Sequence, residues 1–149
     1  MKRFLVGVLA LFAGLLVGGC ANMGLIVLGQ ILIPPPGGEA ETMEAFAESL
    51  KEFQPLDFTF PFLAHALGTL LGAFVAAKIV SQNKMLFGLA VGVFFLLGGV
   101  SVVSQVGGPL WFIILDLMVA YIPMGILGAM LAAKLSAKQA AGQSASGIT

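Results

Sequence analysis

Four long apolar stretches constrain the fold of this chain more than any other feature of its sequence. They run approximately from Phe4 to Ile33, from Phe58 to Ile79, from Met85 to Val106 and from Leu110 to Ala133. Each reaches the roughly 20 residues that an α-helix needs to cross the apolar core of a bilayer. The sequence therefore predicts an all-α membrane protein whose four transmembrane helices form a bundle.

The composition supports this prediction. Hydrophobic residues make up 59% of the 149 and charged residues only 9%, whereas soluble domains carry about 25% charged residues. The formal net charge is zero, so nothing in the charge balance indicates a nucleic-acid partner; the expected partner is the lipid bilayer. A single cysteine and a single histidine exclude paired-thiol chemistry and make a zinc site improbable, so we expect no metal site and no cofactor.

The charged residues indicate the topology. Basic residues flank one side of the predicted spans, namely Lys2, Arg3, Lys78, Lys84, Lys134 and Lys138. The first loop is acidic and carries Glu39, Glu41, Glu44, Glu48, Glu52 and Asp57. Because basic flanks mark the cytoplasmic side, we expect a multi-pass protein of the bacterial inner membrane with both termini in the cytoplasm.

Cys20 raises an alternative for the first span. The string "LLVGGC", with Lys2 and Arg3 upstream, has the form of a bacterial lipoprotein cleavage site. The apolar region of a signal peptide is usually about 7 to 15 residues long, whereas this run continues uncharged to Ile33. We therefore expect an uncleaved helix in which Cys20 is a small packing residue. The alternative is a chain with three spans and a lipidated Cys20.

Small residues recur at four-residue spacing on every predicted span. Lipid gives helices no hydrophobic reason to associate, so contacts form where small side chains let backbones approach closely. The residues expected at these contacts are Gly14, Gly18, Gly68, Gly72, Gly88, Gly92, Gly125 and Ala129, with Ala76 and Ala133 continuing two of the stripes. They predict a compact bundle and leave open a homo-oligomer or a membrane-protein partner.

The second and fourth spans share a string, which indicates an internal repeat. Residues 71–79 read "LGAFVAAKI" and residues 127–135 read "LGAMLAAKL", with identical residues at six of nine positions. Two helical hairpins in tandem would give this pattern. The alternative is that small-residue helices converge on similar strings.

The segments outside the spans differ in character. Residues of about 39–53 predict an amphipathic helix, because Met43, Phe46, Leu50 and Phe53 share one face. Its polar face is acidic, which favours docking on protein over a membrane surface. The first span is about 45 Å long against a bilayer core of roughly 30 Å, so its end should project outside. Residues 1–135 form one transmembrane domain, and the polar tail 136–149 is predicted to be disordered in the cytoplasm.

Two ionisable residues lie within the spans, His65 and Asp116. Such residues are costly in lipid and are candidates for function. If Lys78 and Lys134 mark equal depth, His65 lies about 20 Å and Asp116 about 27 Å from the inner boundary. The two would form an outward-facing pair that exchanges protons, since imidazole is the side chain that titrates near neutral pH.

A structural role is the alternative for this pair. Asp116 would then cap a neighbouring helix, and His65 would bond a carbonyl group or Tyr121. Asn22 on the first span is a further candidate polar residue, which can hydrogen-bond a neighbouring helix. Pro123 predicts a kink in the fourth span that frees the carbonyl group of Val119.

The fourth span also carries the string "PLWFIILDLMVAYIP", with Pro109, Trp111, Phe112, Asp116, Tyr121 and Pro123 in a Pro-x-Trp-Phe, Asp, Tyr-x-Pro pattern. In this string, in the loop "IPPPGG" and in "AHALGTLLGAFVAAK", the chain resembles a widespread group of small, uncharacterised bacterial four-span membrane proteins. The similarity covers most of the chain from Ile33 on. An acidic residue typical of the group's first span is absent. The resemblance implies four spans and no particular activity.

The sequence leaves two functions open. The first is a structural or accessory membrane protein that binds a partner through its acidic helix or its free helix faces. The second is a small oligomeric transporter that uses His65 and Asp116. We expect no catalytic residues and no enzyme, because the sequence offers no nucleophile–base pair, metal cluster or phosphate-binding loop. A cavity connecting His65 to the outside would favour the transporter, and a filled bundle the accessory protein.

Overall fold

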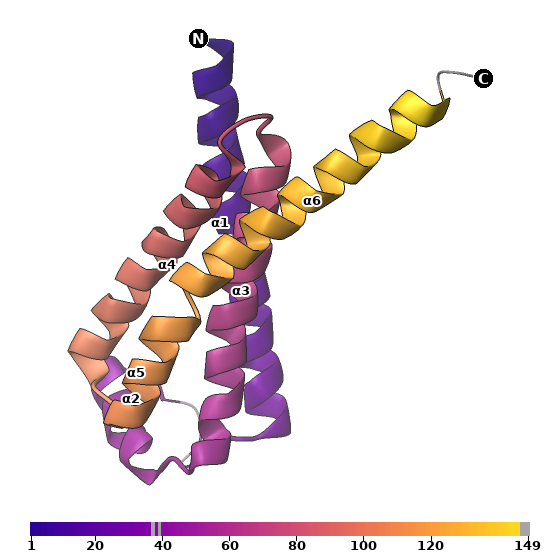
Figure 1. The fold of residues 1–149 in the computed structure, drawn as a ribbon. Coiled ribbons are helices and arrows are strands. Elements are labelled where there is room, and N and C mark those ends of the chain that lie inside the picture. Colours follow the sequence, from indigo (N-terminus) through magenta and orange to yellow (C-terminus); the bar gives the residue numbers. More distant parts are fainter. Residues whose placement is uncertain (37, 39, 147–149) are drawn as a thin grey trace.

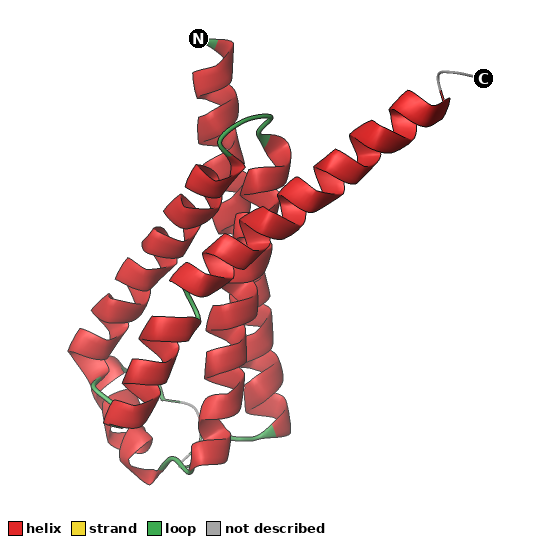
Figure 2. Cartoon of the chain, viewed as in Figure 1, coloured by secondary structure: helices red, strands yellow, loops and turns green. Residues whose placement is uncertain are grey.

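Helices account for every regular element in the computed structural model, which describes residues 1–36, 38 and 40–146 (Figure 1). In chain order the elements are α1 (Lys2–Leu32), α2 (Met43–Ser49), the 3₁₀ turns η1 (Leu50–Glu52) and η2 (Pro55–Phe58), α3 (Thr59–Ile79), α4 (Lys84–Val106), α5 (Leu110–Val119) and α6 (Ile122–Ser146). The described residues include no strand (Figure 2). The all-α prediction is confirmed. Glu39 of the acidic loop and residues 147–149 of the tail lie outside the described residues.

Four helical stretches are long and apolar enough to cross a membrane. They are Lys2–Leu32, Pro55–Ile79, Lys84–Val106 and Leu110–Gln143. Large apolar side chains, such as Phe12 on α1 and Phe94 on α4, point out of the bundle, while the buried core consists mostly of alanine and glycine. This distribution suits a surface that contacts lipid. The chain is a multi-pass membrane protein, as predicted.

The helices form two hairpins that share α3 as a central element. α1 packs against α3, α4 packs against α6, and α3 also contacts both helices of the second hairpin. The start of α1 and the far end of α6 lie at the same end of the bundle (Figure 1). The α2 segment lies at the opposite end, which we call the loop end.

Close glycine contacts hold the first hairpin together. A Cβ atom on Gly14 would lie 2.6 Å from the carbonyl oxygen of Gly72, and one on Gly18 would lie 2.7 Å from that of Gly68. The converse contacts, from Gly72 and Gly68 to the α1 carbonyl groups, are equally short. Only glycine fits at these four positions without moving the backbones apart.

The second hairpin has an equivalent crossing. A Cβ atom on Gly88 would lie 2.6 Å from the carbonyl oxygen of Gly125, and 2.6 Å from the Cβ atom of Ala129. One turn along α4, Gly92 faces the carbonyl oxygen of Tyr121. The structure thus places all eight predicted packing residues at helix crossings. Ala133 is exposed and lies outside this contact.

The repeated strings are not used in equivalent ways. Gly72 faces α1 within its own hairpin, whereas Gly128, at the matching position, faces Leu70 and Phe74 of α3. The string therefore makes a contact within a hairpin in one case and between hairpins in the other. The duplication itself stays a prediction.

Two expectations for α1 are wrong. Its excess length lies at the N-terminal end, which extends past the α3–α4 loop (Figure 1), rather than at the end near Ile33. Gly29 is buried against Phe60 of α3, so the distal end of α1 stays packed in the bundle. Cys20 is exposed on a continuous helix and is not a packing residue.

The amphipathic helix is shorter than predicted. It begins at Met43 because the side chain of Thr42 accepts a hydrogen bond from the backbone N–H of Ala45 at 3.1 Å, as preferred helix-capping residues do. It continues as a 3₁₀ turn to Glu52. Phe53 then packs edge-on against Phe58, at 5.4 Å between ring centroids. The segment therefore docks on the bundle, as its acidic character indicated.

The predicted disorder of the tail is wrong for residues 136–146. They continue α6 as a helix that leans away from the bundle (Figure 1). Lys78 of α3 donates a hydrogen bond to Gln139 at 2.7 Å. The segment is polar but rich in alanine, the residue with the highest helix propensity, and no proline interrupts it.

Candidate functional site

A break in the fourth span positions the polar residues of the bundle. Pro123 has no N–H group to donate to the carbonyl oxygen of Val119, and its ring crowds that group. α5 therefore ends at Val119, and two residues separate it from the start of α6 at Ile122. The kink predicted at Pro123 lies at this break. It turns Tyr121, which is 3% exposed, into the core one turn beyond Asp116.

His65, Asp116 and Tyr121 form a hydrogen-bonded group that we call the polar cluster. Nδ1 of His65 lies 2.9 Å from each carboxylate oxygen of Asp116. A carboxylate only accepts hydrogen bonds, so Nδ1 carries the hydrogen. Tyr121 donates its hydroxyl hydrogen to Oδ2 of Asp116 at 3.0 Å. The rings of His65 and Tyr121 stack at 5.7 Å between centroids.

The predicted pairing of His65 with Asp116 is confirmed, because the two side chains are in direct contact. The depths predicted for them rest on a residue count. The expectation took Lys78 and Lys134 as markers of equal depth. α6 leans away from α3 toward its end (Figure 1), so residue counts along the two helices do not measure the same height. Asp116 is buried in the protein.

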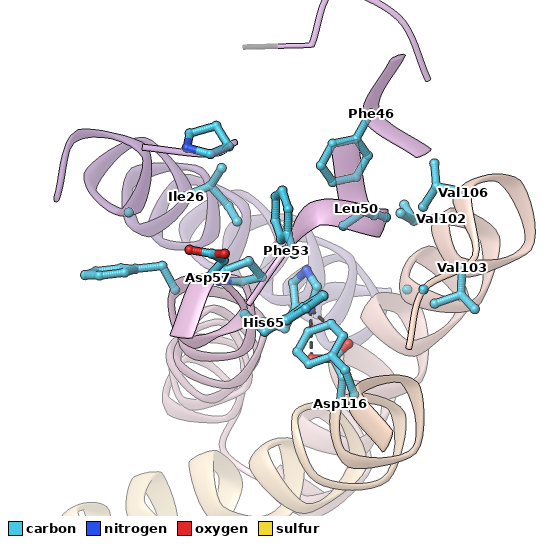
Figure 3. Close-up of a pocket in the computed structure, with 18 of the residues that line it drawn as sticks. Ile26, Phe46, Leu50, Phe53, Asp57, His65, Val102, Val103, Val106 and Asp116 are labelled. Atoms are coloured by element: carbon cyan, nitrogen blue, oxygen red, sulfur yellow. Dashed lines mark hydrogen bonds and ion pairs between the residues drawn. The ribbon is translucent and has the colours of Figure 1, made fainter. Parts of the chain in front are cut away.

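A cavity of about 590 Å³ lies at the loop end, next to the polar cluster. Its walls come from α1, α3, α4 and α5, and the segment from Pro35 to Phe58 covers it. Apolar side chains dominate, including Ile26, Phe46, Leu50, Phe53, Val102 and Val103. Figure 3 shows these side chains around His65, with dashed lines to Asp116. The volume lies within the range typical of small-molecule sites.

The second imidazole nitrogen of His65 faces this cavity. The His65 side chain is 27% exposed, against 4% for Asp116. Within the described residues Nε2 forms no hydrogen bond with the protein, and the edge of the ring that carries it points into the cavity (Figure 3). A buried carboxylate that bonds Nδ1–H fixes the tautomer and leaves a basic nitrogen on the open side. The polar cluster can therefore accept or donate a proton at Nε2.

Sequence reasoning missed Gly99. A Cβ atom on Gly99 would lie 2.8 Å from Cζ of Tyr121, and the hydroxyl group is nearer still. Only glycine leaves room for the Tyr121 side chain to reach Asp116. A single sequence gives no sign that this glycine faces an aromatic ring.

The other predicted polar residue, Asn22, lines the same cavity from α1, and its Cβ atom packs beside Gly68. Trp111 and Phe112, at the start of α5, join an aromatic group around Phe58, with centroid distances of 5.5 Å and 4.5 Å. Phe58 and Phe112 of this group line the cavity. No set of three metal-ligating side chains occurs among the described residues.

Comparisons with protein-family models, with curated proteins and with solved structures found no match. The geometry of the polar cluster and the cavity is therefore the basis for assigning a function.

Proposed function

We propose that this membrane protein binds an amphipathic organic solute in the cavity at the loop end. The apolar part of the solute lies between α1, α4 and the α2 segment, and its polar group bonds Nε2 of His65. One observation carries this proposal: an apolar cavity of about 590 Å³ ends on a basic nitrogen. Small-molecule sites typically combine apolar walls with a few placed polar groups.

Binding of this kind favours the transporter among the two functions that the sequence leaves open. A filled bundle would have favoured a purely structural role, and this bundle holds a cavity beside its only histidine. A transporter of this size would work as an oligomer, in which the exposed faces of α1 and α4 meet a second copy. Uptake of a labelled solute into proteoliposomes would separate transport from binding alone.

The accessory role stays as a second candidate because of α6. Its second half leans away from the bundle (Figure 1) and carries Lys134 and Lys138, which are exposed, so a partner would find an accessible helix there. Deletion of residues 140–149 should abolish co-purification of such a partner and leave solute binding unchanged.

Photochemical labelling tests solute binding directly. A diazirine-bearing long-chain alcohol is irradiated with the purified protein, and the labelled peptides are mapped by mass spectrometry. We expect labels on the cavity wall, at Phe46, Leu50 or Val102. Val103→Phe places a ring on the cavity wall and should reduce this labelling.

Val100→Phe is the matched control. Val100 lies on α4 but is 45% exposed and does not line the cavity, so the same added volume should leave the labelling unchanged. Equal labelling of the wall in both variants would contradict the proposal. Gel filtration and thermal melting of both variants establish that the bundle is intact.

A further inference from the structure

The cavity has an excess of negative charge. Two carboxylates line it, Asp57 from η2 and Asp116 from α5, and none of its described lining residues is a lysine or an arginine. Asp57 accepts a hydrogen bond from the backbone N–H of Gln54 at 2.6 Å. Asp116, in contrast, is buried among helices. A buried carboxyl group in a membrane protein is costly in its ionised form unless a positive charge lies nearby.

His65 is the group that can supply this charge. Two neighbours face His65 from the fourth span. Asp116 lies on α5, and Tyr121 lies at the break before α6 and already donates its hydroxyl hydrogen to the Asp116 carboxylate. From α1 the nearby polar side chain is Asn22, which does not titrate. A protonated imidazole makes the polar cluster neutral, whereas a neutral imidazole leaves it with one negative charge.

The remaining neighbour, α4, contributes no charged side chain near the cavity. Its one charged residue, Lys84, lies at the other end of the helix, where it donates to the carbonyl groups of Ala77 and Val80 at 2.7 Å and 2.6 Å. While Asp116 is ionised, a proton on His65 or a cation entering through the cavity can therefore balance its charge.

We propose that the solute is a protonated amine with an apolar chain, and that its binding displaces the proton from Nε2 of His65. This inference rests on the proposed function. The proton leaves Nε2 for water, and an ammonium N–H then donates to the freed lone pair of Nε2. One positive charge leaves and one arrives, so the charge of the polar cluster with its occupant stays at zero.

Two kinds of selectivity follow from this exchange. An ammonium with an N–H group should bind more tightly than a quaternary ammonium, which carries the charge but cannot donate to Nε2. A hydrogen bond to a charged group corresponds to about tenfold or more in affinity. Once His65 is neutral, a carboxylate of the same chain length should bind most weakly, because it would meet Asp116 and Asp57 without a cation between them.

The test uses five ligands with a ten-carbon chain: decylamine, N,N-dimethyldecylamine, decyltrimethylammonium, decanol and decanoate. Calorimetric titration of the full-length protein in uncharged nanodiscs, in two buffers of different ionisation enthalpy, gives each affinity and the number of protons released. The same titrations on nanodiscs without protein measure partition into the lipid and are subtracted, and titrations on Val103→Phe show how much of the remaining binding depends on the cavity. Both amines should bind at least about tenfold more tightly than decanol.

The pH dependence identifies the displaced proton. While His65 is protonated, each amine should release about one proton, and its affinity should rise up to about tenfold per pH unit. His65→Asn keeps a hydrogen-bond donor toward Asp116 but has no basic nitrogen, so the proton release and the pH dependence should disappear. Asp116→Asn should reduce the preference for amine over alcohol toward one. Thermal melting shows whether each variant is folded.

Equal affinities for amine and decanol, or amine binding without proton release, would overturn the inference. If decanol binding is lost in Val103→Phe, the proposed function stands whatever the amines do. If no ligand distinguishes wild type from Val103→Phe, the proposed function fails and the inference fails with it.

Discussion

At the scale of single residues, the contact between Gly99 and Tyr121 decides whether the polar cluster can form. Gly99→Ala should lower the free energy of unfolding by about 1–3 kcal/mol, because its methyl group would collide with the ring of Tyr121. Gly98→Ala is the matched control, since a Cβ atom there meets nothing within 4 Å. That variant should be unchanged or up to about 1 kcal/mol more stable.

Chemical denaturation of both variants in detergent checks this prediction. Equal stability of Gly99→Ala and Gly98→Ala would show that Tyr121 does not occupy the space beside Gly99. The single tyrosine also provides a spectroscopic probe, because its absorbance reports whether the hydroxyl group keeps its partner.

The members of the polar cluster were predictable from the sequence, and their geometry was not. A histidine and an aspartate stand out in apolar spans because each is costly in lipid. Their distance depends on how α5 lies relative to α3, which a residue count does not give. The cavity was also unpredictable, because it depends on where Phe46, Leu50 and Phe53 come to lie after the loop folds back.

At the scale of helices, the crossing of α1 and α3 should fail when one glycine is replaced. Gly18→Ile would push its side chain against the carbonyl group of Gly68, whereas Gly19→Ile, one residue further, points into open space. We expect Gly18→Ile to lose about 3 kcal/mol or more of stability, and Gly19→Ile to behave as the wild type.

Resistance to unfolding by SDS, followed by circular dichroism, measures this difference. If the two isoleucine variants unfold at the same SDS concentration, the glycine contacts do not hold the hairpin together.

The spans and their contact residues were predictable because length, hydropathy and four-residue spacing are local properties. The start of α2 at Met43 depends on the cap from Thr42, which is also a local feature. The amphipathic pattern extends further toward the N-terminus and therefore predicts an earlier start. The polar composition of the segment after residue 135 predicts disorder, whereas α6 continues through it to Ser146. Alanine-rich polar sequence can continue a helix that packing has already started.

At the scale of the whole molecule, both termini should lie on the cytoplasmic side and the α2 segment on the other. In a Cys20→Ser background, a cysteine at Glu48 should react with an impermeant maleimide added to intact cells. A cysteine at Ser136 should react only after the membrane is opened. The reverse pattern, or reaction of both from outside, would contradict this topology.

The most direct test of the account is ¹⁵N NMR of the protein labelled at histidine, because the chain has a single histidine. We predict that Nδ1 of His65 keeps its hydrogen at every pH at which the protein is folded, and that only Nε2 gains and loses a proton. An added alkylamine should shift the Nε2 signal and leave Nδ1 nearly unchanged. A neutral imidazole with its hydrogen on Nε2, or an Nε2 signal that no amphipathic solute perturbs, would contradict the account.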